Sequence, residues 1–239
     1  MRISIIIPVY NEEKTISQVL DLVLEKMRNL GEVIIIDDGS KDNTGQISRD
    51  YEARNPLVHY YQQPRNMGKT EALKEGFKRS NGEIVIVQDA DLEYDPAEIN
   101  DVVAPIQEDK ADVVLGSRFL VRRASRSLYF RHYMANRLIT FLSNLFTDLN
   151  LTDVETCYKA FRGDIIRNMV ITSTGFGFEV EVVAKVAKLK CRVYEVPISY
   201  YGRTYEEGKK INATDGLMAL WYIIKYNVFT SKKSSFRKS

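Results

Sequence analysis

The first half of the chain alternates between short runs of β-branched residues and stretches with helical periodicity. Such alternation is typical of a parallel sheet wrapped by crossover helices. The sequence therefore predicts an α/β fold with a mostly parallel central sheet and flanking helices. Strands are predicted at residues 4–8, 32–38, 58–62, 83–88, 113–116 and 192–200.

Helical patterns separate several of these strands. One runs from Ile16 to Met27, and we expect Gly31 to end it. A second covers residues 69–79, and Pro96 is predicted to open a third, because proline is tolerated in a first turn.

Polar clusters follow three of the predicted strands, at residues 10–12, 37–40 and 89–93. In open α/β sheets ligands sit in the crevice at the carboxyl edge, where the loops after the strands converge. The sequence therefore indicates a ligand site at this edge.

The third cluster contains an Asp-x-Asp pair, Asp89 and Asp91. A turn after the strand would bring both carboxylates to one cation, and hard oxygen ligands favour Mg²⁺ or Mn²⁺. Such an ion would bind a diphosphate and neutralise the charge that develops on a leaving nucleotide diphosphate. Alternatively, the acids of this segment only cap the helix that begins near Pro96. Capping explains Asp95, which directly precedes Pro96, but it does not explain Asp89 and Asp91.

Two further motifs point to a nucleotide. Asp37 and Asp38 can accept hydrogen bonds from a base or a ribose, and an Asp-Gly-Ser turn at the same place is compatible with that role. The segment 68–70 is Gly-Lys-Thr, but a P-loop also requires Gly at position 63, where this chain has Gln63, so a Walker-type ATPase is rejected. Lys69 is either a donor-phosphate ligand or a solvated lysine at a helix start.

Charge is distributed unevenly along the chain. The 34 Lys+Arg and 32 Asp+Glu of its 239 residues leave a net charge of +2, which does not indicate nucleic-acid binding. Residues 116–147 carry six arginines and no acid, and residues 216–239 carry five basic residues and no acid. Residues 128–149 are also amphipathic, so this stretch either contacts a membrane surface or packs on the core.

No segment reaches the roughly 20 apolar residues that span a bilayer. Nor does the apolar N-terminus read as a secretory signal, so we expect a cytoplasmic protein, with any membrane contact peripheral. Cys157 and Cys191 lie in no metal or redox motif and are read as buried thiols.

The first half of the chain resembles the family 2 glycosyltransferases, which have a GT-A fold. The resemblance rests on five ordered segments, SIIIPVYNEEKTI, IIIDDGSKDNT, NMGKTEALKEGF, IVIVQDADLEYDP and VVLGSRF. Later segments narrow it to the polyprenyl-phosphate glycosyltransferases, the group that contains dolichol-phosphate mannose and glucose synthases. These are TDVETCYKAFR, FGFEVEVVAKVAK and EVPISYYGRTYEEGKKI.

The resemblance implies the roles of individual residues. The nucleotide-sugar site would comprise Pro8, Tyr10, Glu12, Asp37, Asp38, Gly68, Lys69, Asp89, Ala90 and Asp91. The metal, Mg²⁺ or Mn²⁺, would lie among Asp89, Asp91 and Glu93. Arg118, Arg131 and Arg203 would surround the acceptor phosphate and, with Asp91, form the catalytic set, since guanidinium groups bind phosphate bidentately. For Arg122, Arg123 and Arg126 contact with solvent or lipid headgroups is expected instead.

The reaction implied is transfer of a hexose, with inversion, from a UDP-glucose or GDP-mannose type donor to a polyprenyl (dolichyl or undecaprenyl) phosphate. A phosphate acceptor with a second pKa of about 6 attacks without a general base. Residues 1–215 would form the GT-A catalytic domain, with a membrane and acceptor region at 116–150, and residues 216–239 an amphipathic helix and basic tail. That last segment would bind lipid or a second protomer of a homo-oligomer.

Three other readings compete with this one. A soluble family 2 enzyme acting on a glycan hydroxyl would need a base, which Asp153 or Glu155 could supply. A sugar-phosphate nucleotidyltransferase ranks low, because its Gly-rich basic loop is missing. A non-enzymatic nucleotide-sugar scaffold would not need the Asp-x-Asp pair.

Overall fold

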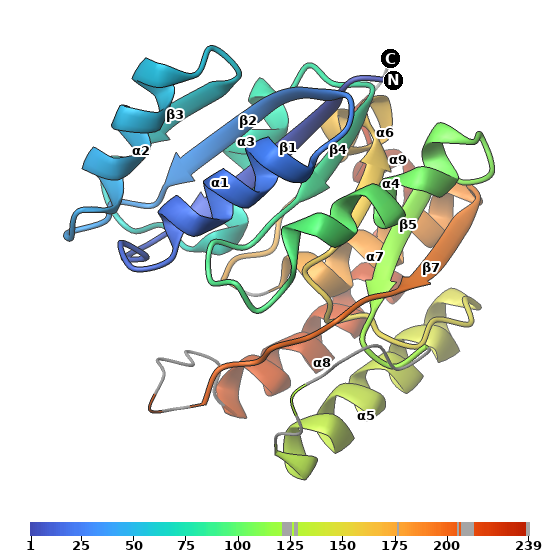
Figure 1. The fold of residues 1–239 in the computed structure, drawn as a ribbon. Helices are drawn as coiled ribbons and strands as arrows, with labels where there is room; N and C mark the ends of the chain where they lie inside the picture. Colours follow the sequence, from blue (N-terminus) through green and yellow to red (C-terminus); the bar gives the residue numbers. More distant parts are fainter. Residues whose placement is uncertain (121–125, 127–128, 176, 205, 207–212, 238–239) are drawn as a thin grey trace.

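A central sheet organises the fold (Figure 1). The computed structural model describes residues 1–120, 126, 129–175, 177–204, 206 and 213–237. Within them the chain forms a seven-stranded sheet in the order β3-β2-β1-β4-β6-β5-β7. Its strands are β1 (Ile3–Val9), β2 (Leu30–Asp37), β3 (Val58–Gln62), β4 (Ile84–Val87), β5 (Val113–Ser117), β6 (Lys159–Arg162) and β7 (Val193–Pro197).

The predicted α/β class and mostly parallel sheet are confirmed. β1 pairs in parallel with β2 and β4, and β5 pairs in parallel with β7. The Ile- and Val-rich runs of β1, β2 and β4 are buried, as expected for strands covered by helices on both faces. Each predicted strand is present, with ends displaced by a few residues at most.

The strand β6 was not predicted. It lies between β4 and β5 and is antiparallel to both. Only four residues long, it begins with Lys159 and ends with Arg162, so no apolar run marks it. The Lys159 side chain is nevertheless fully buried, because its ammonium donates to the main-chain carbonyls of Val154 and Thr156.

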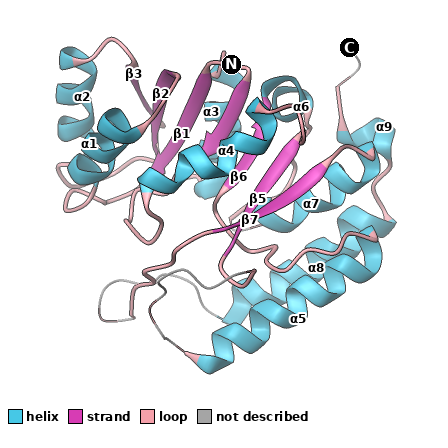
Figure 2. Cartoon of the chain, turned by 45° about the vertical axis from the view of Figure 1, so that its right-hand side comes forward, coloured by secondary structure: helices cyan, strands magenta, loops and turns pink. Residues whose placement is uncertain are grey.

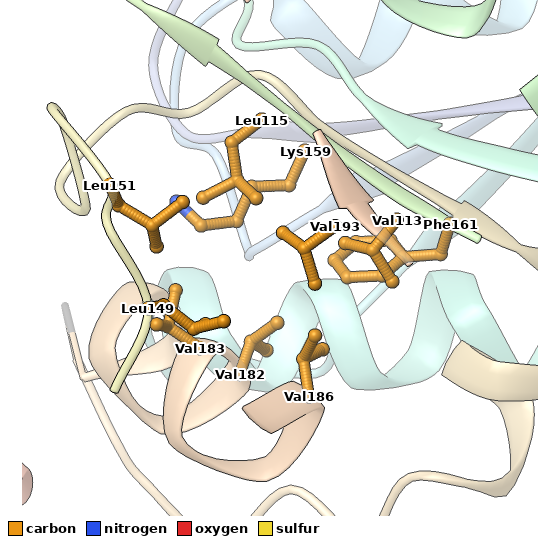
Figure 3. A pocket seen from close by; sticks show the side chains of 10 residues that line it. All are labelled: Val113, Leu115, Leu149, Leu151, Lys159, Phe161, Val182, Val183, Val186 and Val193. Atoms are coloured by element: carbon orange, nitrogen blue, oxygen red, sulfur yellow. The ribbon is translucent and has the colours of Figure 1, made fainter. Parts of the chain in front are cut away.

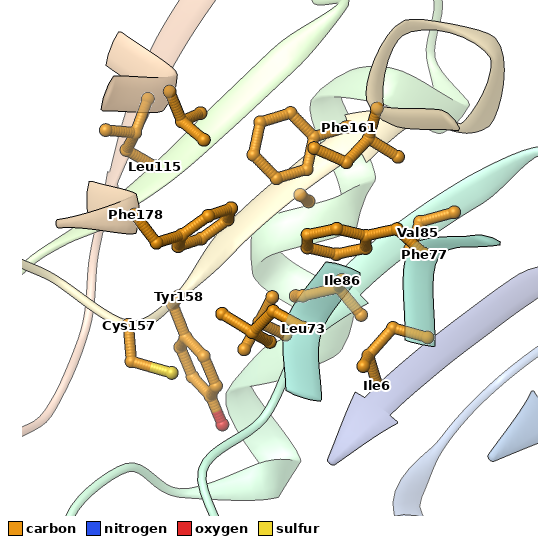
Figure 4. Packing of buried hydrophobic residues seen from close by; sticks show 14 of the residues in the cluster. Ile6, Leu73, Phe77, Val85, Ile86, Leu115, Cys157, Tyr158, Phe161 and Phe178 are labelled. Carbon is orange, nitrogen blue, oxygen red and sulfur yellow. The ribbon is translucent and has the colours of Figure 1, made fainter. Parts of the chain in front are cut away.

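Helices cover both faces of this sheet (Figure 1), with α1 and α4 on one face and α3 and α7 on the other. Figure 4 shows α3 and α7 meeting in the core, where the rings of Phe77 and Phe178 lie 5.5 Å apart. The helical elements are α1 (Ile16–Lys26), α2 (Thr44–Arg54), α3 (Lys69–Arg79), η1 (Pro96–Glu98), α4 (Ile99–Gln107), α5 (Phe130–Thr147), α6 (Gly163–Asn168), α7 (Phe178–Leu189), α8 (Ala213–Val228) and α9 (Lys232–Ser235).

The expected end of the first helix is wrong. α1 stops at Lys26, and Asn29 adopts a left-handed conformation with φ of 56°. Gly31 lies inside β2, which begins at Leu30. Asparagine tolerates this conformation, so the turn does not depend on the glycine.

The helices α5 and α8 lie side by side outside the sheet (Figure 2), and both pack against α7. Each buries one face and exposes a stripe of large apolar side chains on the other. On α5 the stripe comprises Phe130, Met134, Leu138, Phe141 and Leu145, between 51% and 71% exposed. On α8 it comprises Leu217, Trp221, Ile224 and Val228. None of the described helices is both long and apolar enough to cross a membrane.

A small cavity of about 10 Å³ lies between the sheet and α7 (Figure 3). Apart from Lys159, its wall consists of Val, Leu and Phe side chains. Such a volume holds at most one water molecule, so this cavity is not a substrate site.

Candidate active site

The loops after the parallel strands interlock at one edge of the sheet. The Asn11 main-chain NH donates to the Ser40 hydroxyl over 2.9 Å, and the Asn11 side chain accepts from the Lys41 NH over 2.8 Å. The polar clusters at residues 10–12 and 37–40 are therefore in direct contact. Pro8 lies in β1 opposite Ile36, and Tyr10 follows β1, half-buried.

Asp37 is held by groups from two neighbouring elements. One carboxylate oxygen accepts the Ser40 NH over 2.8 Å, and the other accepts the Tyr60 hydroxyl over 2.7 Å. The side chain is fully buried. These bonds fix the turn after β2, and contact of Asp37 with a nucleotide stays a prediction.

Asp38 anchors the loop before α3. Its two oxygens accept the main-chain NH groups of Met67 and Gly68, over 2.7 and 2.8 Å. Burial raises the pKa of Asp38, although these two bonds act in the opposite direction. Gly68, with φ of +93°, directly precedes α3, so Asp38 sets where Lys69 enters the site.

Lys69 connects the Asp-x-Asp loop with α7. Its Nζ lies 3.0 Å from a carboxylate oxygen of Asp89 and 3.4 Å from Oε1 of Glu179. Burial opposes the charge, but the Asp89 carboxylate raises the pKa of Lys69 well above its usual range. The lysine is therefore a charged, partly buried member of the site and not a solvated residue at a helix start.

The Asp-x-Asp segment turns sharply after β4. Leu92 adopts a left-handed φ of 61°, and Asp91 Oδ1 accepts the Glu93 NH over 3.1 Å. Burial, together with the nearby charges of Asp89 and Glu93, raises the pKa of Asp91 to about 7. Ala90, between the two aspartates, is buried.

Glu93 and Arg203 link this turn to the chain after β7. The Glu93 carboxylate accepts the Tyr200 hydroxyl over 2.9 Å and the Arg203 NH over 2.7 Å. The Arg203 guanidinium lies 3.1 Å from Glu12 and donates to the Asp91 carbonyl over 2.7 Å. Arg203 thus joins the first and third predicted clusters.

Arg118, which follows β5, is paired with a buried acid. Its guanidinium donates twice to Asp153, over 2.6 and 2.7 Å, and lies 5.0 Å from the centre of the Tyr200 ring. Asp153 is fully buried. Because its two oxygens are occupied by this guanidinium, Asp153 is poorly placed to serve as the base of a glycan-directed enzyme.

Of the other arginines named in the sequence analysis, Arg126 and Arg131 are described by the structure. Arg131 is exposed in the first turn of α5, and among the described side chains no ion pair joins it to an acidic residue. Arg126 is exposed and donates to the Gly202 carbonyl over 3.3 Å. Arg122 and Arg123 lie outside the described residues.

A divalent cation fits part of the predicted ligand set. Asp89 and Asp91 offer hard carboxylate oxygens, whereas both oxygens of Glu93 already accept protein hydrogen bonds. Among the described residues, no group of three acidic, histidine or cysteine side chains is arranged to hold a metal. Asp95 instead caps the following helix, with Oδ1 accepting the Ala97 NH over 2.9 Å.

Several site residues were not found from the sequence. The sequence analysis assigned no role to Glu179, Tyr200 or Tyr60, although Glu179 and Tyr200 lie in segments that carry the family resemblance. The fold brings all three to the strand-end loops. Tyr200 is the last residue of the strand predicted at residues 192–200, next to the polar loop that follows it.

Comparison with known proteins identifies a family. Residues 4–170 match the model of Glycosyl transferase family 2. The chain is 30% identical to an undecaprenyl-phosphate mannosyltransferase from Micrococcus luteus, over 92% of this chain and 96% of that protein. It is 29% identical to an undecaprenyl-phosphate 4-deoxy-4-formamido-L-arabinose transferase from Edwardsiella ictaluri, over 87% of this chain but 62% of that protein's length.

Solved structures share the fold. Glucosyl-3-phosphoglycerate synthase from Mycobacterium tuberculosis, in complex with Mn²⁺ and UDP-glucose, superposes with a TM-score of 0.75 at 17% identity. The superposition covers 95% of this chain and 79% of that one. The same enzyme with Mg²⁺ and UDP gives a TM-score of 0.73 at 18% identity. These similarities confirm the GT-A fold expected from the sequence.

Proposed function

The chain belongs to glycosyl transferase family 2 and is a glycosyltransferase, and from this premise we propose that it moves a hexose from a nucleotide sugar to a polyprenyl phosphate at the cytoplasmic face of a membrane. The donor is of the UDP-glucose or GDP-mannose type. The names of both relatives begin with the word undecaprenyl-phosphate, and this supports a lipid acceptor for the present chain.

The exposed apolar stripes on α5 and α8 carry this proposal. Their large side chains recur every three or four residues, so each stripe occupies one side of its helix. Since the two helices also pack together, the stripes supply an apolar surface of the kind that inserts into a lipid interface. The exposed Arg131 and Arg137 on α5 suit anionic headgroups.

The acceptor phosphate would meet Arg118 and Arg203 near this surface. Arg118 stands at the start of the segment that leads to α5, and Arg203 precedes the segment that leads to α8. Both arginines connect to the acidic turn, Arg203 directly and Arg118 through the Tyr200 ring. A lipid whose tail lies in the bilayer beside α5 and α8 can therefore place its headgroup at the strand-end loops.

The residues present suit a displacement that needs no protein base. A phosphate acceptor is largely dianionic at neutral pH and attacks the anomeric carbon once the arginines position it. When bound at Asp89 and Asp91, a divalent cation would neutralise the leaving nucleotide diphosphate. Lys69, 3.0 Å from Asp89, adds a second positive charge beside the leaving group.

A transfer assay tests the proposal. Purified protein is incubated with Mn²⁺ or Mg²⁺, undecaprenyl phosphate and radiolabelled UDP- or GDP-sugars, and the label is extracted into organic solvent. We expect metal-dependent transfer from one donor, with inverted anomeric configuration. Label that stays in the aqueous phase with every donor would instead support a water-soluble acceptor.

The apolar stripe of α5 gives a further prediction. Phe141→Asp should weaken binding to vesicles of anionic phospholipid about tenfold, because a 62% exposed phenylalanine no longer enters the lipid. The control is Ala135→Asp, which adds the same charge at an exposed position of α5 outside the stripe. Equal vesicle binding by the two variants in a flotation assay would contradict a membrane role for the stripe.

A further inference from the structure

Two acids tie the chain that follows β7 to the edge of the sheet. Residues 199–204 form this segment, which we call the strap. At its start the main-chain NH and the hydroxyl of Ser199 donate to the two carboxylate oxygens of Glu98, each over 2.8 Å, and both residues are buried. Further along, Glu93 accepts three hydrogen bonds from the strap. Glu98 and Glu93 therefore hold the strap at its start and along its length.

Glu93 binds the strap through its main chain as well as its side chain. The Tyr201 NH donates to the Glu93 carbonyl over 2.9 Å. The two carboxylate oxygens each take a different donor, since Oε2 accepts the Tyr200 hydroxyl and Oε1 accepts the main-chain NH of Arg203. Two of these three donors are main-chain groups. Glu93 therefore fixes the path of the strap and not only the conformation of one side chain.

The strap carries side chains that reach both halves of the site. The Arg203 guanidinium donates to the Asp91 carbonyl over 2.7 Å, on the side of the Asp-x-Asp turn. The Tyr200 ring lies 5.5 Å from the ring of Tyr94 and 5.0 Å from the Arg118 guanidinium. A shift of the strap would therefore move Arg203 and take away the ring that lies against Arg118.

The same contacts make Glu93 unsuited to the metal-binding role that the family resemblance implies. Turning its carboxylate toward a cation at Asp89 and Asp91 would leave the Arg203 NH and the Tyr200 hydroxyl without their acceptor. In the part of the chain that the structure describes, no three acidic, histidine or cysteine side chains are arranged to hold a metal. The carboxylate of Glu93 is thus committed to the strap.

We propose that Glu93 is a positioning residue, which holds the strap, and with it Arg203 and Tyr200, against the Asp-x-Asp turn, and which does not ligate the metal. Its effect on the acceptor rests on the proposed function, whereas its relation to the metal rests on its own contacts. In this role Glu93 sets the separation between the carboxylates that would hold the donor diphosphate and the arginine that would hold the acceptor phosphate. Attack at the anomeric carbon depends on that separation.

Two substitutions of Glu93 distinguish positioning from metal binding. In Glu93→Gln the amide oxygen can still accept the Arg203 NH, and the amide nitrogen can donate to the Tyr200 hydroxyl oxygen. This variant therefore keeps the strap in place while it removes the charge. Glu93→Ala removes both side-chain contacts. A positioning residue predicts that glutamine rescues what alanine loses, whereas a metal ligand predicts that both variants are impaired.

Three measurements on the full chain test the proposal. Mn²⁺ affinity, measured from the electron paramagnetic resonance of free Mn²⁺ in the presence of UDP or GDP, should change less than about threefold in both variants. Amide hydrogen exchange of residues 199–204 should rise about tenfold in Glu93→Ala and stay unchanged in Glu93→Gln. In the transfer assay, Glu93→Ala should raise KM for undecaprenyl phosphate about tenfold and leave KM for the nucleotide sugar within twofold, and Glu93→Gln should behave like wild type.

The control is Glu75→Ala, which removes an acid that pairs with Arg79 on α3 over 2.6 Å and should match wild type in all three measurements. If Glu93→Ala fails to fold, Tyr200→Phe takes its place, because it removes one strap donor and leaves the acid intact; its exchange and its KM for the lipid should rise about threefold. A tenfold loss of Mn²⁺ affinity in Glu93→Gln, or unchanged strap exchange in the variant that removes a contact, would overturn the proposal. Absence of lipid transfer by wild type would contradict the proposed function alone, since Mn²⁺ binding and exchange need no lipid.

Discussion

Replacing Asp91 by asparagine should lower the rate of sugar transfer about 10³-fold without destabilising the fold. The substitution removes one of the two carboxylates that would hold the cation on the leaving diphosphate. At the same time it removes a buried acid that is disfavoured in its charged form by burial and by Asp89 and Glu93. The midpoint of thermal unfolding should therefore stay the same or rise, while kcat/KM at saturating Mn²⁺ falls.

The matched control is Asp95→Ala, four residues further along the same segment. Asp95 caps the helix that begins at Pro96, so this variant should lose about 1 kcal/mol of unfolding free energy and keep its transfer rate. Asp91→Asn should therefore lose activity and keep its stability, whereas Asp95→Ala should lose stability and keep its activity. An Asp91→Asn enzyme with more than a tenth of wild-type activity would show that Asp91 is not a principal metal ligand.

Replacing Arg118 by methionine should lower the free energy of unfolding by about 3 kcal/mol, measured by urea denaturation. Arg118 is 12% exposed and its partner Asp153 is fully buried, so the variant leaves an uncompensated charge in the core. The bidentate geometry, with contacts of 2.6 and 2.7 Å, makes this pair stronger than an ordinary surface ion pair.

A double variant separates stability from function. Arg118→Met combined with Asp153→Leu should recover much of the lost stability, because neither charge remains buried. Its transfer rate should stay low if Arg118 also positions the acceptor phosphate. A double variant as unstable as the single one would contradict the assigned pairing, and a stable, active double variant would remove Arg118 from the acceptor site.

The strand-end clusters could be predicted because their information is local. The run of residues 84–87 is apolar throughout, and the acids begin directly after Gln88, which follows it, so the strand, its burial and its ligand edge can be predicted together. The helix at Lys69–Arg79 matched its predicted bounds for the same reason, since Gly68 and Asn81–Gly82 mark both ends.

Partners across the fold could not be predicted in the same way. Arg118 was expected to face a phosphate, and its pairing with Asp153 depends on how the chain returns from α5 to β6. Glu179 lies in the segment FGFEVEVVAKVAK, which carries the family resemblance but does not reveal that Glu179 approaches Lys69 across the fold. The amphipathic character of residues 128–149 likewise did not decide whether this stretch contacts a membrane or packs on the core. The exposure of Phe141 and Leu145 depends on the folded chain.

The position of β6 also constrains how the protein is made. β4 and β5 follow each other in sequence but never pair, because β6 occupies the place between them and is synthesised more than 40 residues after β5. A nascent chain that has emerged only as far as β5 therefore carries two strands with open hydrogen-bonding edges. Insertion of a strand from so far along the chain is a slow, non-local step, so we expect the catalytic edge to mature late in folding. Until then, those edges can pair with strands of other chains.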